Sequence, residues 1–227
     1  MATVTANLET TSIRIPIGND IWLDADLTMP ADAKGVVLFA HGSGSGRHSP
    51  RNRFVASELN RLPIGTLLAD LLTAEEERVD LRSGALRFDI PMLTRRLVQM
   101  IDWAHGEGFI APLPIGVFGA STGAAAALDA AAARPDVVRA VVSRGGRPDL
   151  AVHIGEVLAP TLLIVGGNDT EVLEMNTWAL HRLKGHKELK VIRGATHLFE
   201  EAGTLEAVAA SAGAWFQRYL TPSIESA

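Results

Sequence analysis

The chain has 227 residues, of which 47% are hydrophobic and 21% are charged, so it is able to fold around a core and is not a disordered protein. Its 21 basic and 26 acidic residues give a formal net charge of -5, which excludes the basic surface of a typical nucleic-acid-binding protein. It contains no cysteine, which excludes disulfides, cysteine-ligated metal sites and a thiol nucleophile.

No segment of the sequence has the pattern of a targeting signal or a membrane span. Residues 1–10 lack the basic and apolar regions of a secretory signal, and no run of about 18 apolar residues follows. No internal repeat or shift in composition divides the chain. We therefore expect one domain over residues 1–227, with a core at about 12–220, located in the cytoplasm and bound to no membrane.

The order of the predicted elements indicates an α/β fold. Residues 11–17 and 21–29 alternate between polar and apolar around a turn at 18–20, which predicts an antiparallel hairpin. Continuous apolar runs then predict buried strands at 35–40, 64–68, 115–118, 137–142, 161–165 and 189–192. Helical patterns between or after them lie at 52–62, 90–105, 122–134, 172–183 and 205–220.

This alternation predicts a mostly parallel, eight-stranded sheet with an antiparallel N-terminal hairpin and helices on both faces. The elements use nearly the whole chain, so no separate lid domain is expected. Residues 70–89 form the largest stretch without an assigned element, and Glu75–Glu77 within it could be a solvated face or the start of a helix.

Ligands of such sheets bind at the carboxyl ends of the strands, so the residues that follow each apolar run are the candidates for function. The strand at 115–118 runs into Gly119, Ser121 and Gly123, a G-x-S-x-G pattern between a strand and an alanine-rich helix. This pattern predicts a strained turn that lifts the Ser121 hydroxyl above the sheet, where it can act as a nucleophile. Side chains at the two glycines would collide with the neighbouring strand or helix. The alternative is an ordinary serine helix cap.

An acid and a base follow later strands, in the order Ser121, Asp169, His197. Asp169 could orient a histidine ring, although alone it would equally suit the N-cap of the next helix. Of the seven histidines, only His197 both follows a strand and lies downstream of Ser121 and Asp169. Should Asp169 not serve as the acid, Asp149 is the first substitute.

The glycine-rich segment at residues 42–46 matches neither a dinucleotide-binding nor a P-loop pattern. We expect it to present the backbone N–H of Ser43, which with the N–H of Thr122 would bind an oxyanion. His41 is expected to hold this loop rather than to react. No cofactor and no metal ion are expected.

In the order of these three residues on the predicted strands, the chain resembles the α/β-hydrolase fold. Within this fold it is similar to the dienelactone hydrolase-like branch of small bacterial hydrolases, some of which are fused to phosphoribosyltransferase domains. The stretches that carry the resemblance are HGSGSGRHSPRNRFVA, GASTGAAAAL, VVSRGGRPDL and GATHLFEE. It extends over about residues 12–220 and implies that Ser121, Asp169 and His197 form a catalytic triad. Dienelactone hydrolases proper have a cysteine nucleophile, and this sequence has Ser121 instead.

The sequence therefore predicts a serine hydrolase that cleaves small carboxylic esters, thioesters or lactones through an acyl-enzyme on Ser121. The alternative is a catalytically silent module of the same fold that binds a ligand or a partner protein. A small-molecule substrate is the expected partner, with no nucleic acid, and a homodimer is one of the open oligomeric states.

Several loop arginines lie near the predicted site, of which Arg47, Arg51 and Arg144 could bind an acidic group of the substrate. We favour the alternative that the loop arginines form ion pairs, for example with Asp149, Glu200 or Glu201.

Overall fold

The computed structural model describes residues 8–18, 20–108 and 110–221. Eight strands lie within these residues: β1 (Thr10–Pro16), β2 (Trp22–Thr28), β3 (Gly35–Ala40), β4 (Ile64–Ala69), β5 (Ile115–Ala120), β6 (Val138–Arg144), β7 (Thr161–Gly166) and β8 (Lys187–Ile192). They form one sheet in the order β1-β2-β4-β3-β5-β6-β7-β8. β1 pairs antiparallel with β2, and β2 pairs antiparallel with β4. All other neighbours in the sheet, from β4 through β3 to β8, pair parallel, which confirms the predicted fold class.

The described residues include six α-helices: α1 (Pro50–Leu59), α2 (Ala74–Ser83), α3 (Ile90–Gly106), α4 (Thr122–Ala133), α5 (Thr170–Arg182) and α6 (Thr204–Leu220). Short 3-10 turns form at η1 (Leu86–Phe88), η2 (Pro148–Leu150) and η3 (Ile154–Glu156). Among these residues no helix combines the length and apolarity that crossing a bilayer requires.

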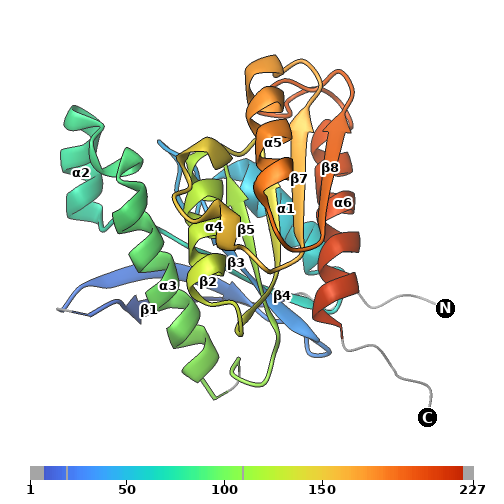
Figure 1. Ribbon diagram of the computed structural model, residues 1–227. Coiled ribbons are helices and arrows are strands. Elements are labelled where there is room, and N and C mark those ends of the chain that lie inside the picture. The colour runs from blue at the N-terminus through green and yellow to red at the C-terminus, as the bar shows by residue number, and fades with distance from the viewer. Residues whose placement is uncertain (1–7, 19, 109, 222–227) are drawn as a thin grey trace, which may run out of the picture.

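Helices cover both faces of the sheet, so the core consists of two apolar layers (Figure 1). α1 and α6 pack on one face, where Leu59 and Phe216 are fully buried. α3, α4 and α5 pack on the other face. The alanines of α4 are small enough to bring that helix close to the sheet, and every residue of α4 from Thr122 to Ala131 is buried. The strand ends that carry the candidate residues are therefore held in place by helices packed on both faces of the sheet.

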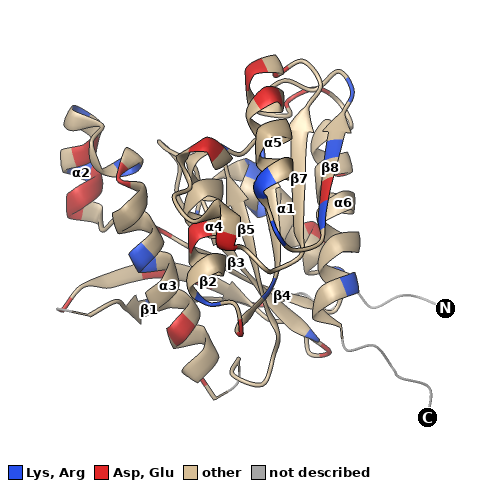
Figure 2. Cartoon of the chain, viewed as in Figure 1, with Lys and Arg blue, Asp and Glu red and all other residues tan. Residues whose placement is uncertain are grey.

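Helix α2 departs from the sequence prediction, because it occupies part of the unassigned segment 70–89 and stands away from the sheet (Figure 1). It has no apolar stripe facing a core, and acidic residues mark it clearly in Figure 2. Its ends are capped instead: the Thr73 hydroxyl accepts the N–H of Glu76, and the Glu76 carboxylate accepts the N–H of Thr73 at 2.8 Å. Glu75–Glu77 are thus the start of a helix.

The buried Arg96 ties α2 to the body of the molecule. Its guanidinium donates to the Glu76 carboxylate and to the backbone oxygen of Leu71, each at 2.7 Å. The Arg96 hydrogen bond lowers the pKa of Glu76, which keeps this carboxylate charged. α2 is therefore held as a short wall beside the carboxyl edge of the sheet, although it contributes little to the core.

Candidate active site

Ser121 stands in the turn between β5 and α4 with strained backbone angles, φ 51° and ψ -122°. Few residues other than glycine adopt a positive φ, and such strain is concentrated at functional sites. The neighbouring backbone maintains it: the Ser121 N–H donates to the Arg144 oxygen at 3.1 Å, and the Ser121 oxygen accepts the N–H of Arg147 at 3.0 Å. The strained turn predicted from the G-x-S-x-G pattern is confirmed.

The glycines around Ser121 allow backbone to touch backbone. A Cβ on Gly119 would lie 2.5 Å from the Cα of Ala124 in α4, and one on Gly123 would lie 2.3 Å from the Ala40 oxygen at the end of β3. Both collisions confirm the sequence prediction. A Cβ on Gly42 would lie 2.9 Å from the Cβ of Ser121. The loop after β3 therefore passes directly against Ser121.

His197 and Asp169 are brought together from separate loops. The His197 Nδ1 lies 2.7 Å from the Asp169 Oδ2, and the Asp169 side chain makes no capping bond to α5 although the residue occupies its N-cap position. The helix-cap alternative for this side chain is thus not used. Asp149, the substitute acid, pairs with Arg147 at 2.8 and 2.9 Å.

The end of β6 connects Ser121 to His197. The Arg144 oxygen accepts the Ser121 N–H. The next residue, Gly145, has φ 51°, and a Cβ on it would lie 3.5 Å from both Nδ1 and Cε1 of the His197 ring. Both candidate residues therefore adjoin the same two residues at the carboxyl edge of the sheet.

The two predicted oxyanion donors also lie together, with one difference from the expectation. The Ser43 N–H donates to the Thr122 hydroxyl at 2.9 Å, so in this state it already has an acceptor. The Thr122 N–H opens α4, where the first N–H groups have no acceptor within the helix.

His41 holds the loop, as expected. The Leu71 N–H donates to its Nε2 at 2.9 Å, which leaves the proton on Nδ1, 3.0 Å from the Gly42 oxygen. Burial lowers the pKa of His41, which favours this neutral form.

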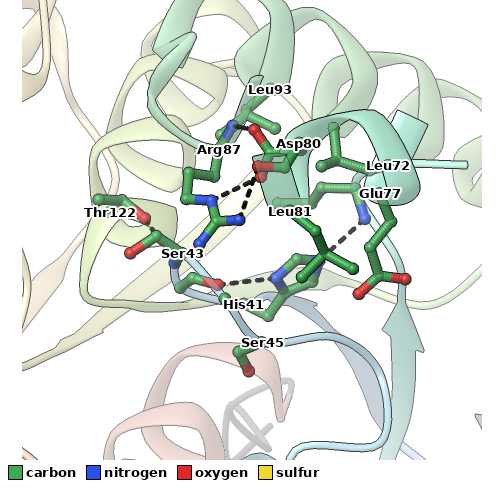
Figure 3. A pocket seen from close by; sticks show the side chains of 13 residues that line it. His41, Ser43, Ser45, Leu72, Glu77, Asp80, Leu81, Arg87, Leu93 and Thr122 are labelled. Carbon is green, nitrogen blue, oxygen red and sulfur yellow. Dashed lines mark hydrogen bonds and ion pairs between the residues drawn. The ribbon is translucent and has the colours of Figure 1, made fainter. Parts of the chain in front are cut away.

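A cavity of about 60 Å³ lies beside Ser43 and Thr122 (Figure 3). Its apolar walls come from Leu71, Leu72, Leu81 and Leu93. Leu81 belongs to α2, so the wall comes partly from the segment that the sequence analysis left unassigned. The T-x-x-E capping box at Thr73 and Glu76 was the available signal for that helix.

The candidate substrate-binding arginines behave differently from one another. Arg47 forms an ion pair with Asp70, and Arg51 lies 3.4 Å from Glu200, as the ion-pair alternative expects. Arg144 is only 7% exposed and has no acidic partner among the described residues. Glu201 instead accepts the hydroxyl of Thr196 at 2.6 Å.

Within residues 8–18, 20–108 and 110–221, no three acidic or histidine side chains gather into a group suited to a metal ion.

The chain is similar over almost its whole length to a solved dienelactone hydrolase from Anabaena variabilis. The two are 52% identical, the match covers 95% of this chain and 100% of that one, and the TM-score is 0.93. A solved serine hydrolase without a lid from Xanthomonas campestris is 20% identical with a TM-score of 0.75, over 95% and 96% of the two chains. That likeness shows the fold alone.

Two curated proteins from strains of Mycobacterium tuberculosis are named "Putative phosphoribosyl transferase" and are 56% identical over 195 residues. The match covers 86% of this chain but 43% of each relative, so the chain spans less than half their length. No protein-family model matches the chain.

The contact of Gly123 with β3 predicts a large effect of Gly123→Ala. The new methyl group would press on the Ala40 oxygen, so we expect the free energy of unfolding to fall by about 1–3 kcal/mol in urea denaturation. Gly155→Ala is the matched control, because nothing lies within 4 Å of its Cβ position, and it should change stability by less than about 0.5 kcal/mol. Equal unfolding midpoints for the two variants would contradict the tight contact.

Proposed function

Because the chain belongs to the dienelactone hydrolase family of α/β-hydrolases, we propose that it is a serine hydrolase of small carboxylic esters, thioesters or lactones. The relatives support hydrolase chemistry in general, and Ser121 in place of a cysteine favours ester cleavage by a serine. The transferase name of the Mycobacterium tuberculosis relatives describes proteins more than twice as long as the matched region, and we do not extend it to this chain.

In the proposed reaction, the Ser121 hydroxyl attacks the carbonyl carbon while His197 takes its proton through Nε2. Asp169 holds Nδ1 of the ring, so that Nε2 is the nitrogen left to act as the base. The resulting imidazolium then returns its proton to the leaving alkoxide, and an acyl-enzyme remains on Ser121. Water, activated by the same imidazole, releases the acid and restores the hydroxyl.

The observation that carries this proposal is the hydrogen bond between Asp169 and His197. A carboxylate at the start of a helix would ordinarily cap it, and this one turns to the imidazole instead. A ring held at Nδ1 by a carboxylate, at the same strand end that holds a serine with strained backbone angles, supports general-base activation of that hydroxyl.

The N–H groups of Ser43 and Thr122 are proposed to bind the oxyanion of the tetrahedral intermediate. The Thr122 hydroxyl now accepts the Ser43 N–H, so the substrate oxygen would replace it as the acceptor.

The cavity next to these donors, which four leucines line together with Glu77, Asp80 and Arg87, is proposed to receive the acyl group. Its volume of about 60 Å³ corresponds to only a few water molecules, which suits short acyl chains.

The rival function is a catalytically silent binding module, and Ser121→Ala separates the two. We expect the protein to react with a fluorophosphonate probe and to hydrolyse p-nitrophenyl acetate, and we expect Ser121→Ala to lose both activities, the second by at least about 10,000-fold. A folded wild-type protein that shows neither signal would favour the binding module.

Asp169→Asn tests the assigned acid. The amide favours the wrong imidazole tautomer, so kcat for p-nitrophenyl acetate should fall by about 10,000-fold with the fold intact by circular dichroism. Asp149→Asn is the control: it lies on another loop and pairs with Arg147, so its kcat should stay within about threefold of wild type. A larger fall in kcat for Asp149→Asn than for Asp169→Asn would assign the role of the acid to Asp149.

Leu81→Ala tests the acyl cavity. Removing this side chain opens the wall formed by α2, so the ratio of kcat/KM for p-nitrophenyl hexanoate to that for the acetate should rise about three- to tenfold. Val79→Ala is the matched control on the same helix, since Val79, like Leu81, is an exposed apolar residue but lies outside the cavity wall. An unchanged chain-length profile in Leu81→Ala would place the acyl group elsewhere.

A further inference from the structure

Asn176 is a fully buried amide in the middle of α5. Its Nδ2 donates to the Gly146 oxygen at 2.9 Å and to the Val172 oxygen at 2.8 Å. Both partners are carbonyl oxygens, so only the NH₂ end of the amide can face them. The other end, Oδ1, is covered by protein and has no hydrogen-bond partner among the described residues.

The stability of α5 does not by itself explain this residue. Asparagine is a poor helix former, and burying an acceptor without a donor costs free energy. The bond to Val172 is a return of the side chain to the carbonyl four residues earlier, and Thr177 makes the same kind of bond to Leu173 on the exposed side of the helix. The bond that distinguishes Asn176 is the one that leaves the helix and reaches the loop after β6.

The loop that this amide reaches lies between the proposed nucleophile and the proposed base. On one side of Gly146, Gly145 adjoins His197, because a Cβ on Gly145 would lie 3.5 Å from the ring Nδ1. On the other side, the Arg147 N–H donates to the Ser121 oxygen at 3.0 Å. A shift of Gly146 would therefore move backbone that contacts both residues.

Gly146 is also packed tightly at its α-carbon. A Cβ there would collide with the hydroxyl of Ser143 and would lie 2.7 Å from the Cβ of Ala124 in the first turn of α4. Ser143 and Ala124 are themselves fully buried. This packing and the hydrogen bond from Asn176 together fix the position of the loop.

The helix that carries Asn176 also carries the proposed acid. Asp169 occupies the N-cap position of α5, and its backbone oxygen accepts the N–H of Leu173 at 2.9 Å. Asn176 lies about two turns further along the same helix. α5 therefore meets His197 through the Asp169 carboxylate and meets the loop after β6 through the Asn176 amide.

We propose that Asn176 is a positioning residue of the site. By fixing Gly146 it keeps the backbone of Ser121 and the ring of His197 in place relative to each other, and through α5 it couples both to Asp169. This inference rests on the proposed hydrolase function and adds to it a residue that touches none of the reacting groups. Because small displacements of reacting groups lower the rate steeply, the loss of Asn176 should affect the chemical step more than substrate binding.

Asn176→Ser removes the bond to the loop selectively. A serine hydroxyl can still donate to the Val172 oxygen, but it is too short to reach Gly146. We expect kcat for p-nitrophenyl acetate to fall by about 10- to 100-fold while KM stays within about threefold of wild type. The rate at which a fluorophosphonate probe labels Ser121 should fall in parallel, since this reaction needs the same activated hydroxyl.

Two further variants make the result specific. Thr177→Val is the matched control, because it removes a side-chain bond to the backbone on the exposed side of α5, and its kcat and labelling rate should stay within about twofold of wild type. Asn176→Ala restores a good helix former and leaves no buried hydroxyl, so it decides the matter should Asn176→Ser fail to fold. Folded Asn176 variants as active as Thr177→Val would overturn the proposal.

A measurement without substrate separates the positioning of the loop from catalysis. Hydrogen exchange followed by NMR should be faster by about tenfold or more for the Arg147 amide in Asn176→Ser or Asn176→Ala, with the amides of α3 and β4 unchanged. If the wild-type protein hydrolyses no ester, the proposed function fails, while this exchange still tests whether Asn176 holds the loop. Equal exchange of Arg147 in all folded variants, or uniform acceleration along the chain, would overturn the inference.

Discussion

The turn between β5 and α4 lies with its backbone directly against the backbone of β3 and of α4. The geometry of the carboxyl edge of the sheet depends on these contacts. Gly123 lies against the end of β3 and Gly119 against α4, with no room for a methyl group at either position. The resulting turn gives Ser121 its positive φ and carries it above the sheet. The loop after β3 then closes on Ser121 through Gly42, which brings Ser43 to Thr122. A displacement of α4 would therefore move Ser121, Thr122 and the loop of Ser43 together.

The carboxyl end of β6 is the second organising feature, because it adjoins both Ser121 and His197. The Arg144 carbonyl accepts the Ser121 N–H, Gly145 lies beside the ring of His197, and the Arg144 side chain packs on the ring of Phe199. The same strand end therefore helps to position both the proposed nucleophile and the proposed base.

Much of the architecture could be predicted from local patterns. Buried parallel strands are continuous apolar runs, and helices that pack on a sheet have an apolar face, so both were found to within a few residues. The need for glycine at 119 and 123 is equally local, because it follows from the turn itself. α2 was not assigned because it has no face on the core: the Thr73 and Glu76 cap and the side chain of Arg96 stabilise it instead.

The direction of particular side chains was decided only by the tertiary structure. Asp169 could cap a helix or orient a histidine, and the choice depends on His197, which arrives from 28 residues later in the chain. The loop arginines looked alike in the sequence. Arg47 and Arg51 pair with the carboxylates of Asp70 and Glu200, which are both distant along the chain. Arg144 instead packs on the ring of Phe199, near a second positive charge. A sequence determines which groups are present, but burial and long-range contacts determine which of them remain unpaired.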